Sequence, residues 1–135
     1  MGCRVGDIIV INNYISHGVT LSRHSFVVLG TENGQIQGLD YDLVCNVMSS
    51  FHSEEHRGKK LEYKGNLEYT PSDQVVEHGN NKRGFIKADQ IYYFNSDTID
   101  YYVIGNITPG LFNAILELAQ QLESVEHITD NLRPG

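Results

Sequence analysis

The sequence predicts a mainly β fold of the α+β class, in which a small twisted antiparallel sheet or barrel is covered by one C-terminal helix. Three observations support this prediction. Short runs of β-branched and aromatic residues recur between residues 5 and 105, as is typical of strands. Clusters of Gly, Asn and Pro separate these runs and favour turns. Only after residue 107 do apolar residues recur every three or four positions, which is the period of a helix.

The individual strands follow from these runs in chain order. Residues 5–11 are rich in Val and Ile and end at Asn12-Asn13, so we expect a strand followed by a polar loop over residues 12–22. Residues 26–30 form a short apolar run that is typical of a buried strand, and Asn33-Gly34 favours a hairpin turn. Further strands are expected at 41–48, 61–64, 67–69, 84–94 and 101–105, with a long exposed loop at 70–83.

The C-terminal part begins with a helix signal. Thr108 offers a capping hydroxyl, and Pro109 suits the first helical position. The apolar face of the expected helix consists of Leu111, Phe112, Ile115, Leu116, Leu118, Ala119 and Leu122. We therefore expect one domain over residues 1–135, with its core at about 5–124 and a frayed tail at 125–135.

The amino-acid composition indicates a globular protein and argues against a membrane protein. The chain has 135 residues, of which 40% are hydrophobic and 20% charged, as is ordinary for a globular domain. No apolar run approaches the roughly 18 residues of a membrane span, and the first strand starts too early for a signal peptide. We expect a cytoplasmic protein without a membrane segment, in which both cysteines are reduced and Cys45 is a core thiol.

The charge distribution is uneven. A formal net charge of −7 argues against nonspecific coating of nucleic acid, because that affinity comes from neutralising phosphates. Residues 97–130 carry acidic side chains and no Lys or Arg, whereas the basic side chains concentrate in 52–64 and 82–87. A locally positive groove on an acidic body is therefore expected.

Five segments, taken together and in order, resemble a known family. They are Gly6-Asp7-Ile8-Ile9-Val10, Arg23-His24-Ser25-Phe26-Val27-Val28-Leu29, Val44-Cys45-Asn46-Val47-Met48-Ser49-Ser50, Ile86-Lys87-Ala88-Asp89-Gln90-Ile91 and Ile104-Gly105-Asn106-Ile107-Thr108. Their order over residues 5–124 is similar to that of the MazF/PemK (Kid) toxins. The resemblance implies an SH3-like barrel, usually a homodimer, that acts as a metal-independent, sequence-selective endoribonuclease on single-stranded RNA. It also implies no cofactor and an antitoxin protein that silences the enzyme.

The resemblance also assigns residue roles. It implies Arg23 and Ser49 as the catalytic pair, and it adds four substrate-binding residues, namely His17, His24, Lys87 and Asp89. The expected loops 12–22 and 52–60 would border the RNA groove.

These assignments agree with the chemistry of metal-free RNA cleavage, in which the 2′-hydroxyl attacks its own phosphate. A guanidinium such as that of Arg23 stabilises the crowded phosphorane through two hydrogen bonds but is a poor proton donor. A histidine such as His17 suits proton transfer near neutrality. Lys87 and Asp89 would share one face if both lie in one strand.

Two other hypotheses remain open. His52-Ser53-Glu54-Glu55-His56 matches the H-x-x-E-H motif of zinc hydrolases, which needs a helix and a third ligand; a polar loop near RNA or solvent is the plainer interpretation. Alternatively, the chain is a non-catalytic SH3-like binding module, or one that targets gyrase as the related CcdB toxins do. The tyrosines at 92, 93, 101 and 102 could stack on bases, but packing on adjacent strands is their plainer interpretation.

Overall fold

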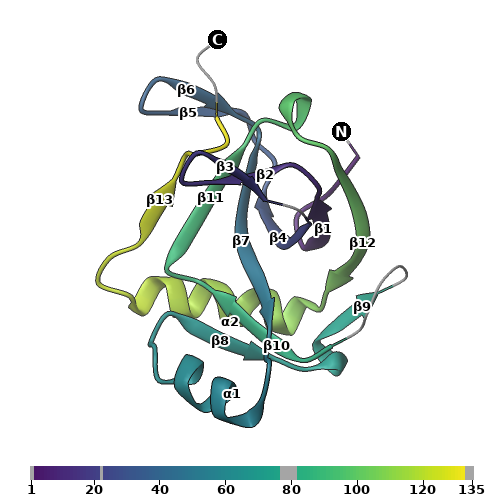
Figure 1. Cartoon of the computed structure of the whole chain (residues 1–135), viewed down its shortest axis with the longest axis vertical. Helices are drawn as coiled ribbons and strands as arrows, with labels where there is room; N and C mark the ends of the chain where they lie inside the picture. Colours follow the sequence, from purple (N-terminus) through teal and green to yellow (C-terminus); the bar gives the residue numbers. More distant parts are fainter. Residues whose placement is uncertain (1, 22, 77–81, 133–135) are drawn as a thin grey trace.

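The computed structural model describes residues 2–21, 23–76 and 82–132, and shows a mainly β protein with a curled antiparallel sheet and two α-helices (Figure 1). The elements in chain order are β1 (Asp7–Ile11), β2 (Tyr14–Ser16), β3 (Val19–Leu21), β4 (His24–Gly30), β5 (Gly34–Ile36), β6 (Leu39–Tyr41), β7 (Leu43–Ser50), α1 (Glu54–Leu61), β8 (Asn66–Tyr69), η1 (Pro71–Asp73), β9 (Gln74–Val76), β10 (Gly84–Lys87), β11 (Gln90–Phe94), η2 (Ser96–Thr98), β12 (Tyr101–Ile107), α2 (Pro109–Gln121) and β13 (Glu126–Ile128).

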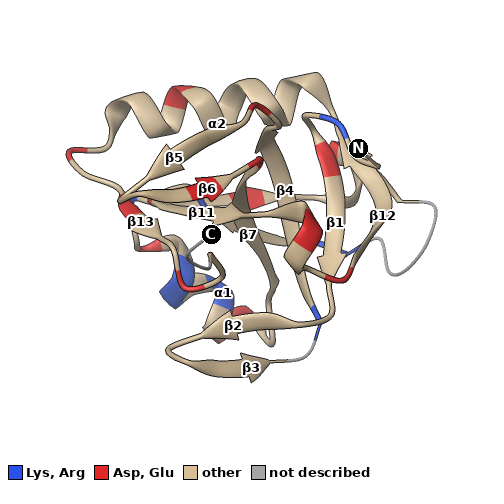
Figure 2. Ribbon diagram, turned by 90° about the horizontal axis from the view of Figure 1, so that it is seen from above, with Lys and Arg blue, Asp and Glu red and all other residues tan. Residues whose placement is uncertain are grey.

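The main sheet has nine strands, and β7 is the strand at which it branches, because it pairs with three others. One edge of β7 pairs with β4, and its other edge pairs first with β11 and then with β10. From β4 the sheet continues through β1 and β12 to β9, and from β11 it continues to β13, which is the one parallel neighbour in this path. The hairpins β2–β3 and β5–β6 project from this sheet as separate two-stranded units (Figures 1 and 2).

Alternation along the strands divides the core between the two faces of the sheet. One face buries an aromatic cluster in which Phe26 meets Tyr92 and Phe94 edge to face. The other face is covered by α2, whose Leu111 and Ile115 join a second cluster of buried residues. The helix begins as the sequence predicts, because the Thr108 hydroxyl accepts a hydrogen bond from the Leu111 N–H. The prediction of a C-terminal helix on a β sheet is thus confirmed.

Several local predictions differ from the structure. Residues 14–21, expected as loop, form the β2–β3 hairpin, and residue 22 lies outside the described residues. The turn expected at Asn33-Gly34 lies instead at Gln37-Gly38, where both residues have positive φ. This backbone suits a two-residue hairpin turn between β5 and β6.

The middle of the chain also departs from expectation. In place of the loop expected at 52–60, the structure has α1, which is capped by the Ser53 hydroxyl. The strand expected at 61–64 is absent, because residues 62–64 form a turn after this helix. The single strand expected at 84–94 is a hairpin of β10 and β11. The described part of 70–83 contains η1 and β9, while residues 77–81 lie outside it.

The expected frayed tail is replaced by ordered structure up to residue 132. β13 pairs with β11, and Asn131 and Leu132 are both buried. Cys45 is fully buried, which confirms the predicted core thiol. No helix among the described residues is long and apolar enough to cross a membrane.

Candidate functional site

The structure distributes the six predicted site residues over three cavities. His17, His24, Ser49 and Lys87 line one cavity of about 410 Å³, called here the histidine cavity. Arg23 lines a second cavity of about 330 Å³, called here the arginine cavity. Asp89 lines neither of them and instead contacts Gly65 near the end of α2. The predicted catalytic pair, Arg23 and Ser49, therefore does not share one cavity.

The two cavities lie on opposite faces of the same strand pair. In β7, Ser49 lines the histidine cavity and its neighbour Ser50 lines the arginine cavity. In β4, His24 lines the histidine cavity and its neighbour Ser25 lines the arginine cavity. Successive side chains of a strand point to opposite faces, so this division follows from the strand geometry.

The β2–β3 hairpin brings His17 to the histidine cavity. His17 and Gly18 form its turn with φ values of 52° and 80°, the left-handed pair that a tight hairpin turn requires. The C-terminal segment fixes this hairpin, because the His17 N–H donates to the Asp130 carboxylate (3.0 Å). Asn131 makes a further pair of hydrogen bonds to Ile15.

His24 stands at the start of β4, beside the buried ring of Tyr14. The two ring centroids lie 4.7 Å apart and the planes are tilted by 50°. Tyr14 also meets Phe26 edge to face at 5.3 Å. This packing connects the imidazole of His24 to the aromatic cluster of the sheet.

Ser49, near the end of β7, and Lys87, the last residue of β10, complete the set of predicted residues in this cavity. β10 and β7 are neighbours in the sheet, with Phe85 opposite Ser49. The described lining of the cavity thus combines one ammonium with three imidazoles, because His127 of β13 joins His17 and His24. Ser16 adds a second serine hydroxyl to that of Ser49.

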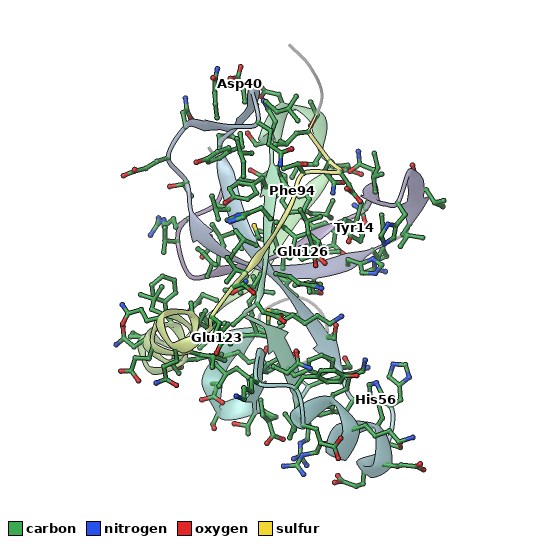
Figure 3. All side chains as sticks on the ribbon, turned by 90° about the vertical axis from the view of Figure 1, so that its left-hand side faces the viewer. Tyr14, Asp40, His56, Phe94, Glu123 and Glu126 are labelled. Carbon is green, nitrogen blue, oxygen red and sulfur yellow. The ribbon has the colours of Figure 1, made fainter. Side chains whose placement is uncertain are left out.

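The opposite wall is acidic and comes from the C-terminal segment. Glu126 and Asp130 line the cavity, and Figure 3 shows Glu126 beside Tyr14, although the two come from opposite ends of the chain. A chain of hydrogen bonds runs from the Tyr92 hydroxyl to Gln90 (3.1 Å) and from the Gln90 amide to Glu126 (3.5 Å). Burial, with Tyr14 close by, raises the pKa of Tyr92, so its hydroxyl stays neutral.

The arginine cavity has a different character. The Arg23 guanidinium donates from Nη2 to the Tyr102 hydroxyl (2.8 Å). Arg23 has a φ of 36°, a left-handed backbone that is uncommon for a residue with a side chain. Lys82 supplies a second cation to the lining of this cavity.

The expectation that Lys87 and Asp89 share one strand face is wrong. β10 ends at Lys87, and Ala88 and Asp89 form the turn to β11. The Asp89 carbonyl accepts a hydrogen bond from the Glu126 N–H (2.7 Å), which anchors β13. In the structure Asp89 is a turn residue, which is the alternative that its residue type favours.

Sequence reasoning missed the polar residues that the C-terminal segment adds to the histidine cavity, because the tail gave no periodic signal. They are Glu126, His127, Thr129 and Asp130. Sequence reasoning also missed Ser50 and Tyr69 in the arginine cavity. For Ser50 a signal existed: a strand places adjacent hydroxyls on opposite faces, so Ser49 and Ser50 could not both lie beside Arg23.

The zinc-hydrolase motif does not assemble a metal site. His52 precedes α1 and lies outside it, so the two histidines of the motif do not share a helix face. His56 Nδ1 accepts a hydrogen bond from the His52 N–H (3.1 Å). Among the residues that the structure describes, no group of three His, Cys, Asp or Glu side chains could hold a metal ion.

No protein-family model matches the chain, and no curated protein sequence is significantly similar to it.

Proposed function

We propose that this protein is a metal-independent endoribonuclease that cleaves single-stranded RNA in the histidine cavity. One observation carries the proposal: imidazoles, an ammonium and the Ser49 hydroxyl converge on one cavity from separate segments. Of its three imidazoles, that of His127 is hydrogen-bonded to the Tyr93 hydroxyl (2.8 Å), which leaves His17 and His24 as the candidates for proton transfer. Imidazoles are the side chains that exchange protons near neutral pH. Together with a cation, they supply the groups that RNA cleavage by its own 2′-hydroxyl requires.

In this mechanism each group has a defined task. One of the two imidazoles of His17 and His24 takes the proton from the 2′-hydroxyl, and the other gives a proton to the leaving 5′-oxygen. Lys87 stabilises the negative charge of the phosphorane, and the Ser49 hydroxyl donates to a phosphate oxygen. The products are a 2′,3′-cyclic phosphate and a free 5′-hydroxyl.

The biological setting of the proposal comes from the motif order. The resemblance to the MazF/PemK toxins favours the toxin of a toxin–antitoxin pair on an SH3-like barrel, active in the cytoplasm as a homodimer. An antitoxin protein would silence it by covering the histidine cavity and the β2–β3 hairpin at its border. Of the family's expected catalytic pair, Ser49 keeps its role, whereas Arg23 belongs to the other face of the sheet.

The test is cleavage of a long mixed-sequence RNA in excess EDTA by the purified protein, free of any antitoxin. We expect reproducible cuts that leave cyclic phosphates. His24→Asn and Lys87→Gln should each lower the rate at least about a hundredfold, as is usual for loss of a general acid–base or charge-stabilising group. Lys64→Gln removes a lysine that lies outside both cavities and should cut at the wild-type rate. No cutting by the folded wild type, or equal cutting by all variants, would refute the proposal.

A non-catalytic binding module is the second candidate. The observation that favours it is the pair of carboxylates, Glu126 and Asp130, in the wall of the histidine cavity. Carboxylates repel phosphate and attract basic peptides. If the wild type binds a basic protein surface, such as one on gyrase, and leaves RNA intact, this function replaces the nuclease.

A further inference from the structure

The arginine cavity has an unpaired hydroxyl at its wall. Tyr69 is 5% exposed and lines the cavity. Its hydroxyl forms no hydrogen bond with the described residues and is not among their fully buried unpaired atoms, so it faces the open cavity. Burial raises the pKa of Tyr69 to about 12, so this hydroxyl keeps its proton at neutral pH. A ligand in the cavity can therefore accept a hydrogen bond from the Tyr69 hydroxyl.

The charge of the cavity favours an anion. Arg23 and Lys82 both line it, and none of its lining residues within the described chain is acidic. This is unusual in a protein with a formal net charge of −7, and Figure 2 shows how widely Asp and Glu are spread over the other elements. The histidine cavity, by contrast, contains two carboxylates.

Hydrogen bonds hold the guanidinium of Arg23 and the backbone of Lys82 in place. The hydrogen bond from Arg23 to Tyr102 orients the guanidinium. Gln74 is 8% exposed and its side-chain amide donates to the Lys82 carbonyl (2.7 Å). A preorganised site of this kind loses little freedom on binding.

Beyond the polar groups, the cavity offers apolar and aromatic surface. Its apolar lining consists of Ile8, Val10, Met48 and Ile104. Tyr102 adds a ring that is 38% exposed, although its hydroxyl is occupied by Arg23. A flat base can pack against such surface, and the volume of about 330 Å³ lies within the range of small-ligand sites.

We propose that the arginine cavity is a nucleotide-binding site. The phosphate group accepts hydrogen bonds from Arg23, Lys82 and the Tyr69 hydroxyl, and the base lies against the apolar lining beside Tyr102. The nucleotide comes either from a single-stranded RNA that bends around the β4–β7 pair or from a free mononucleotide. Binding requires no reaction in the histidine cavity, so this inference and the proposed nuclease can fail separately.

The test is isothermal titration of the full-length protein with two probes in EDTA: adenosine 5′-monophosphate and a 2′-O-methyl RNA heptamer, which cannot be cleaved through its 2′-oxygen. Tyr69→Phe and Arg23→Gln should each weaken binding of the better probe about tenfold or more, because each removes a hydrogen bond to a charged group. Lys64→Gln should bind as the wild type does. Tyr69→Phe deletes only an unpaired hydroxyl, so its melting temperature serves as the check that the fold is intact.

The outcomes separate the two sources. Tighter binding of the heptamer identifies RNA as the source, and tighter binding of the monophosphate identifies a free nucleotide. Three results would overturn the inference: adenosine binding as well as its monophosphate, inorganic phosphate binding as well as the monophosphate, or affinities for both probes that Tyr69→Phe and Arg23→Gln leave unchanged.

Discussion

The side-chain amide of Asn131 pairs with the backbone of Ile15 as a neighbouring strand would. The Ile15 N–H donates to Asn131 Oδ1 (2.7 Å), and Asn131 Nδ2 donates to the Ile15 carbonyl (3.1 Å). Asn131 is 4% exposed, so both hydrogen bonds are shielded from water. Through this contact, 116 residues along the chain, the C-terminal segment fixes the hairpin that carries His17.

The first prediction is that Asn131→Ala loosens this hairpin. The substitution leaves two backbone groups of Ile15 without their partner, so we expect a loss of about 2 kcal/mol in the free energy of unfolding. RNA cleavage should fall further than the unfolded fraction explains, because His17 loses its fixed place. Urea denaturation and the cleavage assay measure the two effects. Asn33→Ala, at an exposed asparagine, is the control, and equal results for the two variants would contradict the prediction.

Asn131 also shows why part of the fold was not predictable from the sequence. Local patterns of apolar residues predict the strands β1, β4 and β7 and the helix α2. β13 is only three residues long, and the contact with Ile15 is made by the single side chain of Asn131. Neither is long enough to produce a repeating pattern of apolar residues in the sequence. Both are held in place by partners more than thirty residues away in the chain. Local sequence patterns contain no information about such distant partners.

The second prediction separates the two cavities with adjacent hydroxyls. Ser49→Ala should slow RNA cleavage about tenfold or more with little change in nucleotide affinity, because its hydroxyl faces the histidine cavity. Ser50→Ala should do the reverse, because Ser50 faces the arginine cavity. Single-turnover rates and titration calorimetry give the two readouts. Parallel losses in both readouts for both variants would show that the cavities act as one site.

The grouping of the candidate site residues was only partly predictable from the sequence. His17, His24, Ser49 and Lys87 were each selected by motif, and they line one cavity. The assignment of Arg23 and Ser49 to one catalytic pair rests only on the resemblance to the toxin family. The strand alternation that separates them depends on the register of β4 against β7, in which Ser25 faces Met48, and register is a property of the assembled sheet.

The third prediction concerns acid stability and the clamp around Glu68. Its carboxylate accepts hydrogen bonds from Arg57 Nε (2.7 Å) and Arg83 Nη2 (2.8 Å), which connects β8 to α1 and to the segment before β10. These hydrogen bonds lower the pKa of Glu68 from its usual 4.5 to about 2. The folded state therefore holds the proton less tightly than the unfolded state does. The stabilisation is present above about pH 4.5 and is lost as the pH falls towards 2.

Glu68→Gln should accordingly lower the free energy of unfolding by about 1 kcal/mol at pH 7, a figure reduced by partial exposure to solvent. The difference from the wild type should shrink as the pH falls from 4.5 to 2. Thermal melts of both proteins across this range measure it. Glu117→Gln, at an exposed position of α2, should change stability by less than about 0.5 kcal/mol. A difference that stays constant with pH would exclude the clamp as its cause.

The last prediction compares two glycines. Gly84, in β10, has no room for a side chain: an added Cβ would collide with the Ser49 carbonyl oxygen and would lie 2.7 Å from the Tyr69 hydroxyl. Gly84→Ala should therefore cost about 2 to 3 kcal/mol, as overpacking of a core does. Because the collision displaces Tyr69, the variant should also lose nucleotide affinity in the arginine cavity under conditions where it remains folded.

Gly58, in α1, is the matched control. An added Cβ there would meet nothing within 4 Å, and alanine favours the helical backbone over glycine by about 1 kcal/mol. Gly58→Ala should thus stabilise the protein slightly and leave nucleotide affinity unchanged. Urea denaturation and calorimetric titration of both variants test the pair. A Gly84→Ala variant as stable as the wild type would contradict the close packing of β10 against β7 and Tyr69. It would also contradict the position of Tyr69 in the wall of the arginine cavity.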